Sequence, residues 1–212
     1  MIAVKICGIT LPADAAMVAG AGADYLGLNF WPRSRRFVAV EQGAVLARAA
    51  RASGPAKIVG VFVNADPAEV VATAKAVPLD AVQLHGDELP ADVARIAEAT
   101  GLPIWKAVAA GTSRDVEDLD RFRAQMILLD TPSAGRGGAG TAFDWALARE
   151  ARARFPGLPL VLAGGLNPEN VASAIACVAP DAVDVASGVE SAPGLKDPAK
   201  VAAFIAAVRA MQ

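Results

Sequence analysis

The chain of 212 residues is 54% hydrophobic and only 20% charged, so it is long enough for one sizeable core and short for two ordinary domains. This composition excludes disorder for most of the chain. The 20 basic and 22 acidic residues leave a net charge of −2, which favours neither nucleic acid nor an acidic membrane surface as a partner. We therefore expect a single domain spanning residues 1–212.

Membrane insertion and metal binding are also disfavoured. The mean hydropathy of +0.39 is positive, but the longest charge-free stretch, residues 155–168, is interrupted by prolines and glycines and is too short to span a bilayer. The N-terminus lacks the pattern of a secretory signal, so we expect a cytoplasmic protein. Cys7 and Cys177 match no zinc spacing and His85 is the only histidine, which argues against a disulfide framework and against a metal site with nitrogen or sulfur ligands.

Short apolar runs alternate with longer segments rich in Ala, Arg and Glu along the whole chain, which is typical of repeated βα units around a parallel sheet. The expected strands are residues 2–6, 24–29, 57–63, 80–84, 103–108, 126–129, 159–162 and 182–185. The expected helices are residues 12–21, 40–52, 67–77, 90–100, 113–124, 143–153, 168–179 and 197–210. Eight evenly spaced units predict a closed (β/α)8 TIM barrel of the α/β class, with a doubly wound open sheet as the alternative.

Three helix starts have a clear physical signal. Asp66, Asn167 and Asp197 each precede a proline, and a capping side chain followed by proline in the first turn is typical of a helix N-terminus. We therefore expect helices to begin at these three positions.

The two kinds of loop differ in their chemistry. Segments that lead from helix to strand are short and bland, whereas segments that follow strands contain the reactive side chains. In a barrel, all the segments that follow strands lie at the C-terminal face, where barrel active sites are found. We therefore expect the functional site at this face.

Two glycine-containing turns, residues 163–167 and 186–190, follow the last two expected strands. Glycine allows backbone N–H groups to approach a phosphate closely, and this pair of loops often forms a phosphate site in barrels. We predict that Gly164, Gly165, Ser187 and Gly188 bind phosphate. The alternative for either turn taken alone is an ordinary tight turn.

Cys7 and Asp130 lie at the ends of the first and sixth expected strands. A thiol whose pKa is lowered by nearby cations can act as a base or nucleophile, and Lys5 projects to the same side of its strand as Cys7. A carboxyl group at an apolar strand end can act as an acid near neutral pH. The alternatives are an inert buried cysteine and a turn aspartate. A glycine-rich segment, residues 133–140, follows Asp130 and is compatible with a substrate cover or with flexible surface.

Two further candidates lie in the loops that follow strands. Arg36 belongs to a cluster with Arg33 and Arg35, and guanidinium groups bind carboxylates or phosphates through paired hydrogen bonds. His85 follows the fourth expected strand and can bind a polar substrate group or transfer a proton. A solvated surface run and a structural histidine are the respective alternatives.

Together these motifs resemble phosphoribosylanthranilate isomerase, a barrel enzyme of tryptophan biosynthesis. The matching stretches are KICGI (5–9), GLNF (27–30), SRRFV (34–38), VGVFVN (59–64), VQLHGDE (82–88), LD (129–130), FDW (143–145), LAGGL (162–166) and DVASGVE (184–190). They occur in order and cover almost every strand end. Two positions depart from the family's pattern: Ala139 and Ala186 stand where hydroxyl side chains are usual, which puts phosphate affinity in doubt rather than the reaction type.

The resemblance implies an Amadori rearrangement of N-(5-phosphoribosyl)anthranilate without a cofactor. By this resemblance Asp130 is the general acid and Cys7 the general base. Arg36 then holds the anthranilate carboxylate, Asp184 lies near the ribose and amino groups, and the loops at Gly164-Gly165 and Ser187-Gly188 bind phosphate. The expected partner is a small phosphoribosyl substrate, with no nucleic acid and no membrane, and the chain is expected to be a monomer or homodimer.

Rival functions remain open on the sequence alone. Another phosphate-binding barrel isomerase would use paired aspartates, and a metal-dependent epimerase would need more histidines than this chain contains. A non-catalytic barrel that binds sugar phosphates would need neither Cys7 nor Asp130.

Overall fold

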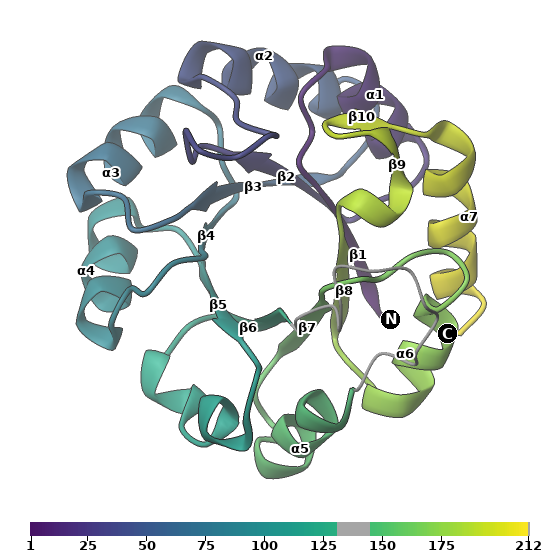
Figure 1. Cartoon of the computed structure of the whole chain (residues 1–212). Coiled ribbons are helices and arrows are strands. Elements are labelled where there is room, and N and C mark those ends of the chain that lie inside the picture. Colours follow the sequence, from purple (N-terminus) through teal and green to yellow (C-terminus); the bar gives the residue numbers. More distant parts are fainter. Residues whose placement is uncertain (131–144, 212) are drawn as a thin grey trace.

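The computed structural model describes residues 1–130 and 145–211. Eight parallel strands pair in sequence order, and the first closes on the eighth to form a barrel (Figure 1). The strands are β1 (Ala3–Cys7), β2 (Tyr25–Asn29), β3 (Lys57–Phe62), β4 (Ala81–Leu84), β5 (Ile104–Ala109), β6 (Met126–Asp130), β7 (Leu160–Ala163) and β8 (Ala182–Val185). The closed barrel predicted from the alternation is confirmed, and the open sheet is excluded.

Helices surround the barrel (Figure 1). They are α1 (Pro12–Gly20), α2 (Val40–Arg51), α3 (Pro67–Ala76), α4 (Pro90–Thr100), α5 (Ala146–Arg154), α6 (Val171–Val178) and α7 (Pro198–Arg209). The Asp66 and Asp197 carboxylates accept hydrogen bonds from the first-turn N–H groups of α3 and α7, as predicted. The start predicted at Asn167 is too early: its side chain accepts from the N–H groups of Glu169 and Asn170, but this closes a turn that precedes α6. None of the helices in the described residues is long and apolar enough to cross a membrane.

The helix predicted at residues 113–124 is wrong. Two short 3-10 helices, η1 (Ser113–Val116) and η2 (Leu119–Phe122), lie there instead. The Asp115 carboxylate accepts hydrogen bonds from the N–H groups of Gly111 and Thr112 at 3.1 and 2.7 Å, and Arg123 ends the second turn in the left-handed region at φ 49°. Short polar side chains that bond the backbone in this way compete with a continuous α-helix.

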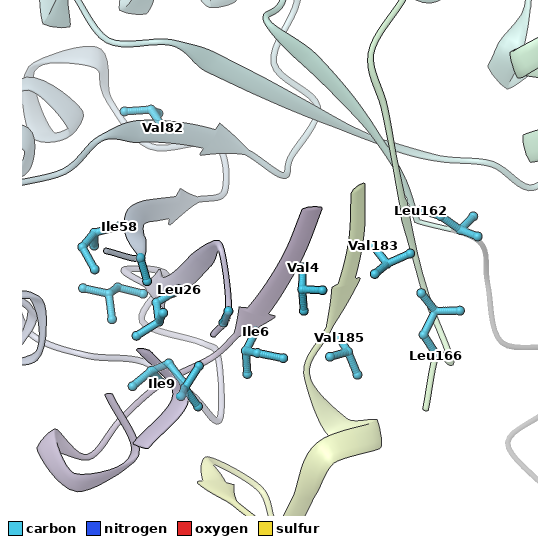
Figure 2. Packing of buried hydrophobic residues seen from close by; sticks show 14 of the residues in the cluster. Val4, Ile6, Ile9, Leu26, Ile58, Val82, Leu162, Leu166, Val183 and Val185 are labelled. Atoms are coloured by element: carbon cyan, nitrogen blue, oxygen red, sulfur yellow. The ribbon is translucent and has the colours of Figure 1, made fainter. Parts of the chain in front are cut away.

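The strands separate two layers of buried side chains. Because successive residues of a strand point to opposite faces, Val4 and Ile6 of β1 share one face with Val183 and Val185 of β8 (Figure 2), and they belong to the same core cluster as Phe204 and Val208 of α7. The residues between them point into the barrel: Lys5 pairs in register with Asp184, and both are buried. This alternation places charged side chains inside the barrel, below the C-terminal ends of β1 and β8.

A small addition to the barrel follows β8. It consists of the 3-10 helix η3 (Ser187–Val189) and an antiparallel hairpin of β9 (Glu190–Ala192) and β10 (Leu195–Lys196), none of which the sequence analysis predicts. The hairpin pairs Glu190 with Lys196. The hydroxyl of Thr10, in the loop after β1, donates to the Gly194 carbonyl at 2.6 Å. This bond fixes the hairpin beside the loop that follows β1, the strand that ends at Cys7.

Candidate active site

One cavity of about 250 Å³ collects most of the predicted site residues at the C-terminal ends of the strands. Its lining includes Cys7, Arg36, His85, Asp130, Gly164, Gly165, Asp184 and Ser187. A larger cavity of about 450 Å³ lies beside it over β5 and η2 and shares His85. We take the smaller one as the candidate active site because the ends of β1, β6 and β8 bring ionisable side chains together there.

Gly188 does not belong to the lining of this cavity. A Cβ atom at this position would lie 1.9 Å from the carbonyl oxygen of Leu166. The close approach holds the loop after β8 against the loop after β7. Gly188 thus packs between the two loops that contain Gly164, Gly165 and Ser187, and its contribution to phosphate binding stays a prediction.

Cys7 ends β1 opposite Gly27 of β2. A Cβ atom at Gly27 would lie 2.6 Å from the Cys7 Sγ atom, so the thiol occupies the space that the absent side chain leaves. Lys5 points to the same side of β1, as predicted, and its Nζ atom lies 3.0 Å from Asp184 Oδ1. The end of β1 thus combines a half-buried thiol with a fully buried ion pair.

The electrostatics around Cys7 differ from what the sequence suggests. Burial raises the pKa of the Cys7 thiol above its usual value, and the Asp184 carboxylate adds to this effect, while Lys5 and Lys196 oppose it. Burial also lowers the pKa of Lys5, but attraction to Asp184 and Cys7 outweighs burial and leaves that pKa raised. Near neutral pH, the resting site therefore pairs a protonated lysine with a thiol that has largely kept its proton.

Asp130 ends β6 and contacts His85. The His85 Nε2 atom lies 3.2 Å from Asp130 Oδ2, and its Nδ1 atom lies 2.9 Å from Nε2 of the buried Gln83. Because an amide NH2 group only donates, Nδ1 accepts from Gln83 in this arrangement, and Nε2 donates to Asp130. His85 therefore links a buried amide to the carboxylate expected to act as the acid.

Arg36 reaches the cavity from the loop between β2 and α2. Its Nε and Nη2 atoms donate to the two carboxylate oxygens of Glu190, at 2.7 and 2.6 Å. Hydrogen bonds from Arg36 and Lys196 outweigh the effect of burial and lower the pKa of Glu190. Arg36 is thus present at the site as predicted, but one edge of its guanidinium group is already occupied.

Sequence reasoning missed three residues that touch the site residues: Gln83, Glu190 and Lys196. Glu190 and Lys196 are far from Arg36 in the sequence, so no local spacing indicates that they contact it or its partner. Gln83 lies on the same side of β4 as His85, a spacing of two residues that could have indicated their contact. The glycine-rich segment, Ala139 and the stretch 143–144 lie outside the described residues.

Known proteins match the chain over nearly its full length. The family model described as N-(5'phosphoribosyl)anthranilate (PRA) isomerase matches residues 4–207. A relative from Pseudomonas fluorescens, named N-(5'-phosphoribosyl)anthranilate isomerase, is 48% identical over 210 residues, which cover 97% of this chain and 94% of that protein.

Solved structures agree with these sequence matches. The crystal structure of phosphoribosyl anthranilate isomerase from Thermotoga maritima has a TM-score of 0.88 and 44% identity, and the match covers 99% of this chain and 100% of that one. A structure of such an isomerase in complex with reduced 1-(o-carboxyphenylamino)-1-deoxyribulose 5-phosphate has a TM-score of 0.87 and 42% identity, with the same coverage. The chain therefore belongs to the N-(5'-phosphoribosyl)anthranilate isomerase family.

Proposed function

We propose that this chain converts N-(5-phosphoribosyl)anthranilate to 1-(2-carboxyphenylamino)-1-deoxyribulose 5-phosphate, the aldose–ketose isomerisation of tryptophan biosynthesis. The observation that supports this best is the single cavity in which Cys7 of β1, Asp130 of β6 and the loops after β7 and β8 meet. An acid, a base and a phosphate site are sufficient for this reaction, because the hydrogen moves by proton transfers.

The two catalytic roles follow from the chemistry of the rearrangement. Asp130 gives a proton to the ribose ring oxygen, the bond from C1 to that oxygen breaks, and the nitrogen lone pair forms a Schiff base. The Cys7 thiolate then removes the proton from C2, and the electron pair of that bond forms an enolamine. Protonation at C1 and loss of the O2 proton give the ketone. The reaction is an internal redox step, so we propose no cofactor and no metal.

The remaining lining residues suit substrate binding. We assign the anthranilate carboxylate to Arg36 and the phosphate to the loops at Gly164-Gly165 and Ser187, which Gly188 holds together. Asp184 gives one carboxylate oxygen to Lys5, which leaves the other oxygen for a ribose hydroxyl or the amino group. His85 contacts Asp130, so we assign it to the reacting end of the sugar as well. Ala186 has no hydroxyl group, which leaves the Ser187 hydroxyl and backbone N–H groups as the phosphate donors of its loop.

The test is an isomerase assay with substrate generated in situ, because N-(5-phosphoribosyl)anthranilate is labile. General acid–base catalysis contributes about 10²- to 10⁴-fold, so we expect losses of this order in Cys7→Ser and Asp130→Asn. Cys177→Ser is the matched control, because Cys177 lies half-buried on α6 outside the cavity. Full activity in both site variants would refute the roles, and an inactive wild-type protein would refute the function.

Location and assembly belong to the same proposal. We propose that the chain acts in the cytoplasm, as a monomer or a homodimer, on a small phosphoribosyl substrate and without nucleic acid or membrane. Sedimentation at micromolar concentration separates the two assembly states.

A further inference from the structure

Two buried charged side chains, Glu190 and Lys196, form a series with Arg36 on the side of its guanidinium group that binds Glu190. Glu190 of β9 accepts two hydrogen bonds from Arg36, and Lys196 of β10 donates to Glu190 Oε1 at 2.9 Å. The side chains of Glu190 and Lys196 are only 5% and 0% exposed. A buried lysine is costly unless it has a definite partner, so its presence next to a substrate-facing arginine requires an explanation.

The geometry of the pair limits what Arg36 can offer to a ligand. Glu190 occupies the edge formed by Nε and Nη2, and the stem of Arg36 packs so close to Gly8 that a Cβ atom there would lie 2.2 Å from the Arg36 Cδ atom. Gly8 therefore restricts the aliphatic stem of Arg36, and Glu190 restricts its guanidinium group. Within residues 1–130 and 145–211, no hydrogen bond engages Nη1, so this end of the group can bind an anion in the cavity that Arg36 lines.

The net charge of Arg36, Glu190 and Lys196 explains why a lysine is buried beside Glu190. Arg36 and Glu190 alone sum to zero, so a carboxylate that approaches Arg36 would meet a neutral pair. Lys196 adds one positive charge, and its Nζ atom donates to the Glu190 carboxylate and to the Ala186 carbonyl at 3.1 Å. With Lys196 the three groups sum to +1, which is what an approaching carboxylate needs in a poorly solvated site.

We propose that Glu190 and Lys196 are specificity-determining residues. Glu190 fixes the orientation of the Arg36 guanidinium group, and Lys196 offsets the negative charge of Glu190. The unoccupied end of Arg36 can then bind the substrate carboxylate with a net charge of +1. This inference rests on the proposed function, because it concerns the substrate carboxylate assigned to Arg36. The β9–β10 hairpin is then the structural element that selects a substrate with a carboxylate on its aromatic ring.

The ionisation of the three groups is consistent with this arrangement. Hydrogen bonding to Glu190 raises the pKa of Arg36, so the guanidinium stays charged. Burial lowers the pKa of Lys196, and the Glu190 carboxylate offsets only part of this shift. Glu190 itself is held ionised by its two cationic partners, which outweigh its burial.

The experiment measures binding of two reduced product analogues by titration calorimetry. One is 1-(2-carboxyphenylamino)-1-deoxyribitol 5-phosphate, and the other is the phenylamino compound that lacks the carboxylate. The ratio of their dissociation constants, unsubstituted over carboxylated, is the carboxylate preference. We expect Lys196→Met to reduce this preference roughly tenfold or more while the affinity for the unsubstituted analogue changes little.

Two further variants separate charge from packing. The double variant Glu190→Gln/Lys196→Met removes one charge of each sign and restores a sum of +1, so we expect it to regain most of the preference lost in Lys196→Met. Glu190→Gln alone leaves a sum of +2 and keeps an amide oxygen that can still accept a hydrogen bond from Arg36, so it should retain at least the wild-type preference. Lys200→Met is the matched control, because Lys200 is exposed and donates to the Glu190 backbone carbonyl rather than to its carboxylate.

The outcomes distinguish the inference from the proposed function. If Lys196→Met weakens both analogues equally, or if the double variant is worse than the single one, the charge-balance inference is wrong. If Lys196→Met does not fold, a double variant whose carboxylate preference falls well below the wild-type value overturns the inference instead. A wild-type protein that binds both analogues equally also overturns the inference, whereas one that binds neither contradicts the proposed function.

Discussion

The two halves of the cavity are built in different ways. On the side of β1 and β8, the thiol of Cys7 lies among buried charges that occur in pairs, Lys5 with Asp184 and Lys196 with Glu190. On the side of β4 and β6, His85 and Asp130 are 34% and 40% exposed and form one contact at 3.2 Å. The paired charges beside the base are therefore almost fully buried, whereas the two groups on the acid side are in contact with solvent.

This difference has a physical consequence for each half. Charges removed from water must be paired, and their mutual effects are weakly screened, so each group on the base side sets the behaviour of its neighbours. An exposed pair is screened by water and contributes little stability. We therefore expect substitutions on the base side to change both stability and catalysis, and those on the acid side, the acid itself excepted, to change catalysis modestly.

Lys5→Met is expected to have the largest effect. It leaves the Asp184 carboxylate buried without its partner, which costs about 3–5 kcal/mol of unfolding free energy. Lys5 lowers the pKa of Cys7 against the effect of burial, so its loss raises that pKa further. Because the thiolate is the base, activity rises with pH through this pKa, and the rise should move to higher pH in the variant. Denaturant unfolding and the pH dependence of kcat/KM measure the two effects.

The control for Lys5→Met is Lys57→Met. Lys57 begins β3, does not line the cavity and is exposed, so this variant removes the same charge without leaving a buried partner. It should keep its stability to within about 0.5 kcal/mol and should leave the pH profile unchanged. A Lys5→Met protein with a wild-type pH profile would show that the buried ion pair does not act on the thiol.

The sequence predicted the fold better than it predicted local breaks in the helices. Alternating runs identified the eight strands because a buried parallel strand is apolar throughout, and Asp66 and Asp197 marked two helix starts by direct side-chain capping. The prediction of a helix over residues 113–124 was wrong because the Asp115 carboxylate accepts hydrogen bonds from the N–H groups of Gly111 and Thr112. Composition alone does not distinguish that local turn from a helix.

The sequence brought the residues at strand ends to one cavity, but it did not reveal the contacts between distant segments. Cys7, His85 and Asp130 follow from the rule that functional groups lie where strands end, whereas Asp184, which lies within β8, is implied only by the family resemblance. The pairing of Arg36 with Glu190 joins positions 154 residues apart, and it depends on a hairpin that is too short to leave a pattern. The sequence therefore predicted which groups are present, but not which of their hydrogen-bonding edges are already occupied.

Gly27→Ala is expected to have the next largest effect, because it acts on the position of the base rather than on its charge. A Cβ atom there would lie 2.6 Å from the Cys7 Sγ atom, so the thiol or the strand must move. A misplacement of about 1 Å can reduce a rate about 10²-fold, and overpacking costs about 1–3 kcal/mol. Steady-state kinetics should show the loss in kcat more than in KM. Gly20→Ala is the matched control, since the nearest atom there is 3.8 Å away, and equal effects of both variants would contradict this reading of Gly27.

His85→Gln is expected to have the smallest effect and tests the acid side directly. It removes the ring that donates to Asp130, but water can replace that donor because the Asp130 side chain is 40% exposed. A hydrogen bond of this kind contributes about 0.5–1.5 kcal/mol, which corresponds to a loss in kcat of roughly 3- to 10-fold and little change in unfolding free energy. The same kinetic assay compares this variant with Asp130→Asn. If His85→Gln loses as much activity as Asp130→Asn, the acid depends on its histidine partner as strictly as the base side depends on its ion pairs, and solvent exposure does not separate the two halves of the cavity.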